Sequence, residues 1–229
     1  IGAGGLGAAC LQYLASAGIG RIIVADGDTV ELSNLQRQVI HREYSLGQNK
    51  AESAARAMRE INPTCEVEAL PLRLNGDALL QQVARADVVV DCSDNFPTRH
   101  AINRACFALG KPLVSGAAIR FDGQLTTFDP RDPHSPCYHC LFPDADSADE
   151  ERCAVMGVFA PLVGVIGSLQ ASEALKLISR SGSCLIGRLM LHEGLHLRWQ
   201  EVKFARDPGC PVCAGREKVN NKEIAACAD

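Results

Sequence analysis

Several features are missing from this 229-residue sequence, and each absence excludes a class of protein. No apolar run reaches the roughly 18 residues that a membrane-spanning helix needs, and the first residues carry neither a basic region nor a cleavage pattern. The Lys and Arg residues are scattered and the net charge is only −4, so no basic surface for nucleic acid or an anionic membrane is indicated. We therefore expect a soluble, cytoplasmic protein without a nucleic-acid or membrane partner.

The cysteines do not indicate a disulfide scaffold, because their number, 11, is odd and the chain is long. Four of them form two CxxC pairs, CYHC (Cys137, Cys140) and CPVC (Cys210, Cys213). Each pair has the spacing with which two thiolates bind one ion, and together they complete a closed tetrahedral site, so we predict a structural zinc ion. The alternative is two unrelated pairs or a redox dithiol, but a redox CxxC opens a helix after a strand, whereas CPVC lies in a Pro- and Gly-rich stretch.

Short β-branched runs alternate with amphipathic stretches, which is typical of an α/β fold. We predict a Rossmann-like, mainly parallel sheet with helices on both faces, continuing into an antiparallel C-terminal part. The predicted strands are 21–26, 65–74, 87–94, 112–120 and 123–130, with a hairpin over 188–204; the predicted helices are 7–17, 48–60, 75–86, a segment capped by Asn95 or Thr98 that runs to Gly110, and 160–179. Residues 1–213 are expected to form a single domain, with an acidic mobile loop at 144–152 and a polar tail at 214–229.

The chain opens on IGAGGLG, in which Gly2, Gly4 and Gly7 satisfy GxGxxG and Gly5 adds another glycine. Glycines let the backbone approach a phosphate closely, and the following helix adds positive potential at its N-terminus. The acidic Asp26 ends the next strand and is placed to accept bonds from ribose hydroxyls. This motif alone fits an NAD-dependent dehydrogenase, and it also fits a tight turn that binds nothing.

The polar segment after Asp26 favours a triphosphate over a dinucleotide. It contains Asn34 and Arg37, and Lys50 follows at the start of the next helix. A guanidinium forks onto phosphate oxygens, and an ammonium adds charge where pyrophosphate will leave. The alternative is that Arg37 and Lys50 are merely solvated surface charges.

Two further residues are candidates for the chemistry. Asp94 ends the predicted strand 87–94, at the sheet edge where open α/β folds bind ligands, and could hold Mg²⁺ on the phosphates or cap the next helix. Cys153 follows Arg152 and precedes a helix, which can lower a thiol pKa and make a nucleophile; the alternative is a buried, inert thiol.

The motifs together resemble one family, the MoeB/ThiF (HesA) adenylyltransferases, relatives of the ubiquitin-activating enzymes. The resemblance covers essentially the whole chain and rests on IGAGGLG, ADGDTVELSNLQRQ, Lys50, DCSDN, PLVSGAAIRFDGQ, CYHC, APLVGVIGSLQASEALKL and DPGCPVC, in this order. It implies a zinc-bearing, Rossmann-like homodimer. The implied reaction uses ATP and Mg²⁺ to adenylate the C-terminal glycine carboxylate of a ubiquitin-like sulfur carrier, MoaD- or ThiS-like, for molybdopterin or thiamin synthesis.

The resemblance also implies roles for individual residues. Gly5 and Asp26 correspond to loop and ribose contacts, and Asp94 corresponds to the magnesium ligand. The polyphosphate contacts would be Asn34, Arg37 and Lys50. Cys153 falls where ThiF-type members have a cysteine linked to sulfur transfer or to a covalent bond with the carrier. MoeB-type members do not need this cysteine for adenylation. The sulfur donor would be a separate protein, such as a cysteine desulfurase or a rhodanese-like protein.

One departure from the family concerns the start of the chain. Family members carry a helix and the first, central strand before the glycine loop, and this sequence begins at the end of that strand. We expect a fragment that binds zinc and adenylates poorly. The two rival functions are an NAD-dependent oxidoreductase, which leaves Arg37, Lys50 and the cysteine pairs without a role, and a non-catalytic, zinc-stabilised module that docks a ubiquitin-like protein.

Overall fold

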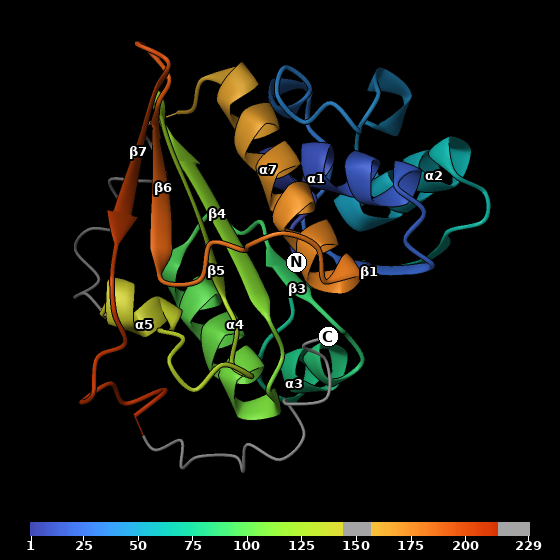
Figure 1. Ribbon diagram of the computed structural model, residues 1–229. Coiled ribbons are helices and arrows are strands. Elements are labelled where there is room, and N and C mark those ends of the chain that lie inside the picture. Colours follow the sequence, from blue (N-terminus) through green and yellow to red (C-terminus); the bar gives the residue numbers. More distant parts are fainter. Residues whose placement is uncertain (144–156, 215–229) are drawn as a thin grey trace.

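The computed structural model describes residues 1–143 and 157–214, and their strands form two hydrogen-bonded groups (Figure 1). β1 (Arg21–Ala25) pairs in parallel with β2 (Glu66–Leu70). The second group has the order β3–β4–β5–β6–β7, and the parallel pair in it is β3 with β4. The bounds of these five strands are Val89–Asp91, Leu113–Ile119, Asp122–Phe128, Arg188–Glu193 and Arg198–Lys203.

The backbone of Ile1 and Gly2 lies between β1 and β3. The Gly2 N–H donates to the Ala25 carbonyl at 2.8 Å, and the Cys92 N–H donates to the Ile1 carbonyl at 2.8 Å. The amino group of Ile1 donates to the Val90 carbonyl at 2.8 Å. These bonds place Ile1 and Gly2 where the sequence predicts the end of the central strand, and they lead the chain from the middle of the two strand groups into the glycine loop.

The antiparallel part of the sheet begins earlier than predicted. The hairpin of β6 and β7 is antiparallel, as expected, but β5 also pairs antiparallel with β4 and with β6, whereas β1–β2 and β3–β4 are parallel. Only Arg120 and Phe121 connect β4 to β5. Parallel neighbours need a crossover of about a dozen residues or more, so a two-residue connection leaves only the antiparallel arrangement.

Helices cover both faces of the five-stranded sheet, as predicted. Leu113 and Val114 are consecutive in β4, so their side chains point to opposite faces. Val114 belongs to the core formed with α1, α2 and α7, and Leu113 belongs to the core formed with α3, α4 and the cysteine pairs. The helix bounds are α1 Gly5–Ser16, α2 Lys50–Ile61, α3 Gly76–Ala84, α4 Phe96–Leu109, α5 Tyr138–Leu141 and α7 Ala160–Ser179, with the 3₁₀ turns η1 Leu32–Asn34 and η2 Glu43–Ser45.

α7 corrects the expectation that no segment is long and apolar enough to cross a membrane. By length and composition alone this helix passes that test, with a mean hydropathy of 1.2 over 18 residues. In the fold α7 packs against α1, β4 and β5 (Figure 1). The contact with α1 depends on Gly167, where a Cβ atom would lie 2.2 Å from the carbonyl oxygen of Leu6. Its apolar character therefore serves a core contact within the chain.

Candidate functional site

The glycine loop runs from the β1–β3 junction into α1, and two of its glycines are required by packing. Gly2 has a φ of +95°, and a Cβ there would lie 2.7 Å from the carbonyl oxygen of Cys92. A Cβ at Gly7 would lie 2.1 Å from the carbonyl oxygen of Gly2. Such close backbone approaches are the physical reason for glycine at both ends of the motif.

The two middle glycines differ in their surroundings. Gly5 faces α7, where a Cβ would lie 2.9 Å from a methyl group of Val163. Gly4 faces more open space, and its nearest neighbour in that direction is the Gln38 side chain at 3.6 Å. Of the two, Gly4 leaves more room for a ligand. The close packing of Gly5 is a second reason for a glycine there, beside the loop contact that the resemblance implies.

Asp26 holds the loop in place with its carboxylate. One oxygen accepts from the Ala3 N–H at 2.7 Å, and the other accepts from the Asp28 N–H at 2.8 Å. Asn49, which the sequence reasoning missed, donates to the carbonyls of Asp26 and Asp28 and caps α2 through the Ala51 N–H at 2.8 Å. The predicted ribose-binding residue is therefore fixed between the loop and the start of α2.

Lys50 is not a solvated surface charge, so that interpretation is wrong. The residue is only 7% exposed, and its Nζ lies 3.3 Å from a carboxylate oxygen of Asp28. Arg73 contacts the other oxygen of the same carboxylate at 2.7 Å. These two cations, Arg73 first, hold the pKa of Asp28 below its ordinary value. A buried ammonium needs a counter-charge. Asp28 supplies it to Lys50, which is the first residue of α2.

η1 and the residues that follow it carry polar side chains whose hydrogen-bonding capacity is only partly used by the described residues. The guanidinium of Arg37 donates to the Ser33 carbonyl at 3.2 Å, and no carboxylate among the described residues forms an ion pair with it. Asn34 is 8% exposed and Gln38 is 4% exposed. The amide oxygen of each has no hydrogen-bond partner within the described chain. Gln38, which lies against Gly4, is a second residue that the sequence reasoning missed.

Asp94 lies exposed just beyond the carboxyl end of β3. The helix cap that was its alternative role belongs to Asn95, whose side chain accepts from the Thr98 N–H at 3.0 Å. Asp26, Asp28 and Asp94 all raise the pKa of Arg73, with Asp28 contributing most. The structure thus gathers three carboxylates near one guanidinium, at the strand ends where the sequence predicts a ligand site.

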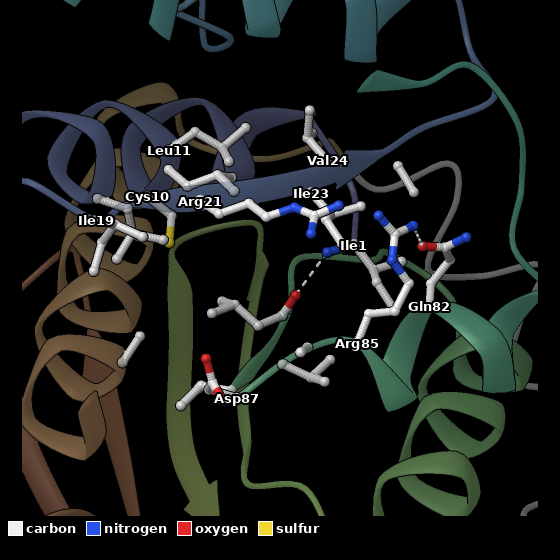
Figure 2. Close-up of a pocket in the computed structure, with 18 of the residues that line it drawn as sticks. Ile1, Cys10, Leu11, Ile19, Arg21, Ile23, Val24, Gln82, Arg85 and Asp87 are labelled. Atoms are coloured by element: carbon white, nitrogen blue, oxygen red, sulfur yellow. Dashed lines mark hydrogen bonds between the residues drawn. The ribbon is translucent and has the colours of Figure 1, made fainter. Parts of the chain in front are cut away.

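A cavity of about 470 Å³ lies between β1 and β3, beside this site (Figure 2). Figure 2 shows Ile1 and Ile23 at its wall, with Arg85 and Gln82 on the α3 side. Its lining is mostly apolar and does not include Lys50 or Asp94. The predicted polyphosphate contacts Asn34, Arg37 and Lys50 therefore lie outside this cavity, whereas Gly2 of the glycine loop is part of its lining.

The two CxxC pairs come together, as their spacing predicts. The sulfur of Cys137 lies 3.8 Å from that of Cys140 and 3.5 Å from that of Cys210, and Cys140 lies 3.4 Å from Cys213. All four sulfur atoms lie within 4.8 Å of one another. A tetrahedral ion with bonds of about 2.3 Å requires sulfur separations of about 3.8 Å, so the cluster fits a metal site and excludes two unrelated pairs.

Other predicted features lie outside the described residues. They are Cys153, the acidic segment 144–152 and the tail from 215 to 229.

A family model described as the ThiF family matches residues 1–212. The chain belongs to the ThiF family. It is 46% identical to the SAMP-activating enzyme E1 of Haloferax volcanii over 93% of this chain and 78% of that protein. Two Escherichia coli proteins match similarly: the molybdopterin-synthase adenylyltransferase at 45% identity (93% of this chain, 85% of that protein) and the sulfur carrier protein ThiS adenylyltransferase at 44% (94% and 84%).

Solved structures share the fold of this ThiF-family chain. The microcin C7 biosynthetic enzyme MccB in complex with N-formylated MccA superimposes with a TM-score of 0.82 at 27% identity. The match covers 93% of this chain and 66% of that protein, so the chain spans slightly less than two thirds of MccB.

Proposed function

We propose that this ThiF-family protein is an adenylyltransferase that uses ATP to activate the C-terminal glycine carboxylate of a ubiquitin-like sulfur carrier. The observation that carries this proposal is the buried Lys50 beside the Asp26–Asp28 segment that holds the glycine loop. A lysine side chain is rarely buried unless its interactions offset the cost of desolvating the ammonium. A polyphosphate, arriving beside Asp28, is a ligand for which a fixed ammonium is useful.

The reaction follows from the charges at the site. A carboxylate oxygen of the carrier attacks the α-phosphorus, and the bond from that phosphorus to the bridging oxygen of pyrophosphate breaks, which yields an acyl-adenylate. The attacking carboxylate is already ionised, so no general base is needed. Lys50 and Arg37 stabilise the charge that develops on the leaving pyrophosphate, and the buried, ion-paired position of Lys50 reduces the reorganisation this requires.

Two metal ions complete the proposal. Asp94 would hold Mg²⁺, since its carboxylate is exposed at the strand end and is not used as the helix cap. Bound magnesium neutralises phosphate charge. The cysteine cluster would hold a structural Zn²⁺, because four sulfur donors leave no open coordination position for catalysis.

The relatives support the carrier as substrate and leave its identity open between two pathways. The molybdopterin-synthase and ThiS adenylyltransferases of Escherichia coli match almost equally, at 45% and 44% identity. A dinucleotide would leave Lys50 and Arg37 without a role, and the named relatives are adenylyltransferases, so we do not retain the dehydrogenase alternative. Our proposal includes a homodimer and a separate sulfur donor.

ATP–pyrophosphate exchange tests the proposal, with MoaD-like and ThiS-like carriers assayed separately. Exchange should appear with one carrier and should fall by at least about 100-fold in Asp94→Asn, because the charge that holds magnesium is lost. Asp87→Asn is the matched control, since Asp87 is an exposed aspartate before the other end of β3. Absence of exchange with both carriers would contradict the proposal, as would equal effects of the two substitutions.

A further inference from the structure

His41 is a buried histidine for which the sequence offers no partner pattern, and the structure engages both of its ring nitrogens. It is 3% exposed and lies between η1 and η2. Its Nε2 is 2.9 Å from the carbonyl oxygen of Ala3, and its Nδ1 is 2.9 Å from the hydroxyl of Ser53. One imidazole ring therefore connects the glycine loop to α2.

The protonation state of the ring follows from these partners. A carbonyl oxygen only accepts, so Nε2 must carry the proton that is donated to Ala3. Burial is the main reason why the pKa of His41 lies below its ordinary value. The ring is thus neutral near pH 7, Nδ1 accepts, and the Ser53 hydroxyl donates.

The bond to Ala3 also orients the next peptide group. The carbonyl of Ala3 and the N–H of Gly4 belong to one planar trans peptide, so they point in opposite directions. While His41 holds the carbonyl, the Gly4 N–H is directed away from the imidazole. That N–H donates to no acceptor among residues 1–143 and 157–214, and it lies at the N-cap of α1, which has no side-chain cap. An unpaired donor at a helix N-terminus suits a phosphate oxygen.

The other end of the ring sets the position of Lys50. Ser53 lies on α2 one turn after Lys50, the first residue of that helix. Ala3 is held at its N–H by Asp26 and at its carbonyl by His41. The distance between the loop and the buried ammonium is therefore fixed through the imidazole.

We propose that His41 is a positioning residue for ATP, which aims the Gly4 N–H at a phosphate and fixes the glycine loop relative to Lys50. This inference rests on the proposed function, in that it names a further residue of the same site. His41 itself touches no phosphate in this scheme; it acts through Ala3 and Ser53.

Two uncharged substitutions separate the two ends of the ring. In His41→Gln the side-chain amide can reach the place of Nε2 and donate to Ala3. In His41→Asn the amide is too short for Ala3 and reaches only the place of Nδ1. The dissociation constant for ATP, measured by calorimetry without a carrier, should rise about tenfold in His41→Asn, as expected for one lost hydrogen bond, and should stay within about threefold of the unsubstituted protein in His41→Gln. The KM for the carrier should not change in either variant.

Ser53→Ala provides a second test of the inference in case His41→Asn does not fold. It removes only the restraint at Nδ1, so the ATP dissociation constant should rise about two- to threefold with the carrier KM unchanged. Unchanged ATP affinity in both His41→Asn and Ser53→Ala would overturn the inference, and so would equal loss in the Gln and Asn variants. If the unsubstituted protein binds no ATP at all, the proposed function itself fails, which this binding assay distinguishes from a failure of the His41 inference alone.

Discussion

At the residue scale, the burial of Lys50 leads to a prediction about the exchange activity. Substitution of Lys50 by Gln removes the ammonium but leaves Asp28 paired with Arg73 at 2.7 Å. The exchange rate should therefore fall about 100- to 1,000-fold, as when one preorganised donor is lost. The thermal midpoint should change little, because no buried charge is left unpaired. Lys203→Gln, at an exposed lysine of β7, is the control for net charge.

Some residues of the candidate site could be predicted from the sequence and others could not. Asp26 and Asp94 were predicted because they end strands, where ligands bind in open α/β folds. His41 and Asp28 were missed because their partners are set by the tertiary fold. His41 contacts a backbone carbonyl 38 positions away, and no periodic pattern marks such a bond.

At the scale of elements, the packing of α7 on α1 gives a matched pair of substitutions. Gly167→Ala places a Cβ 2.2 Å from the Leu6 carbonyl oxygen and should destabilise the fold by about 1–3 kcal/mol. Gly164→Ala meets nothing within 4 Å and should stabilise it by about 0.5–1 kcal/mol, since alanine is the better helix former. Urea unfolding measures both. Equal effects of the two substitutions would show that α7 does not contact α1 in this register.

The pairing of β1 with β2 is coupled to α3 by Glu68. The guanidinium groups of Arg85 and Arg21 lower the pKa of Glu68 from its ordinary 4.5 to about 2. A carboxyl with a lowered pKa in the folded state stabilises the fold fully above the unfolded pKa, and this contribution is lost as pH falls toward the folded pKa.

We therefore expect Glu68→Gln to lower the free energy of unfolding at pH 6 and the difference from the unsubstituted protein to vanish between about pH 4.5 and pH 2. Glu66→Gln is the control, because Glu66 lies 3.8 Å from Arg21 and is largely exposed. The difference should also shrink in about 1 M salt, which screens exposed charges. A pH-independent difference would mean that Glu68 acts through packing.

Helices and strands could largely be predicted at this scale, whereas strand direction could not. The predicted helix 160–179 coincides with α7, because its length and composition are local properties. The orientation of β5 depends on the two-residue connection after β4, and apolar alternation is the same in parallel and antiparallel strands. Sequence periodicity therefore predicts elements more reliably than their pairing.

At the scale of the whole molecule, the cysteine cluster closes the chain on itself. Cys137 and Cys210 are 73 positions apart, and their sulfur atoms lie 3.5 Å from each other. Together with Cys140 and Cys213 they join α5 to the turn at 210–213, on the sheet face that carries α3 and α4. Lys50 begins α2, which packs on the other face, so we expect the cluster to contribute to stability and not to the chemistry.

Removal of the metal should lower the stability of the fold and leave the chemistry of the ATP site unchanged. The purified protein should contain one zinc ion per chain, and chelation should lower the free energy of unfolding by about 4 kcal/mol, the chain entropy of a closed loop of this length. Cys213→Ser should lose zinc and stability together, whereas Cys184→Ser, outside the cluster, should keep both. ATP–pyrophosphate exchange, measured well below the lowered midpoint, should stay within about twofold, because no preorganised group of the loop is lost. A collapse of exchange in metal-free but folded protein would place the cluster in the chemistry and contradict this separation of roles.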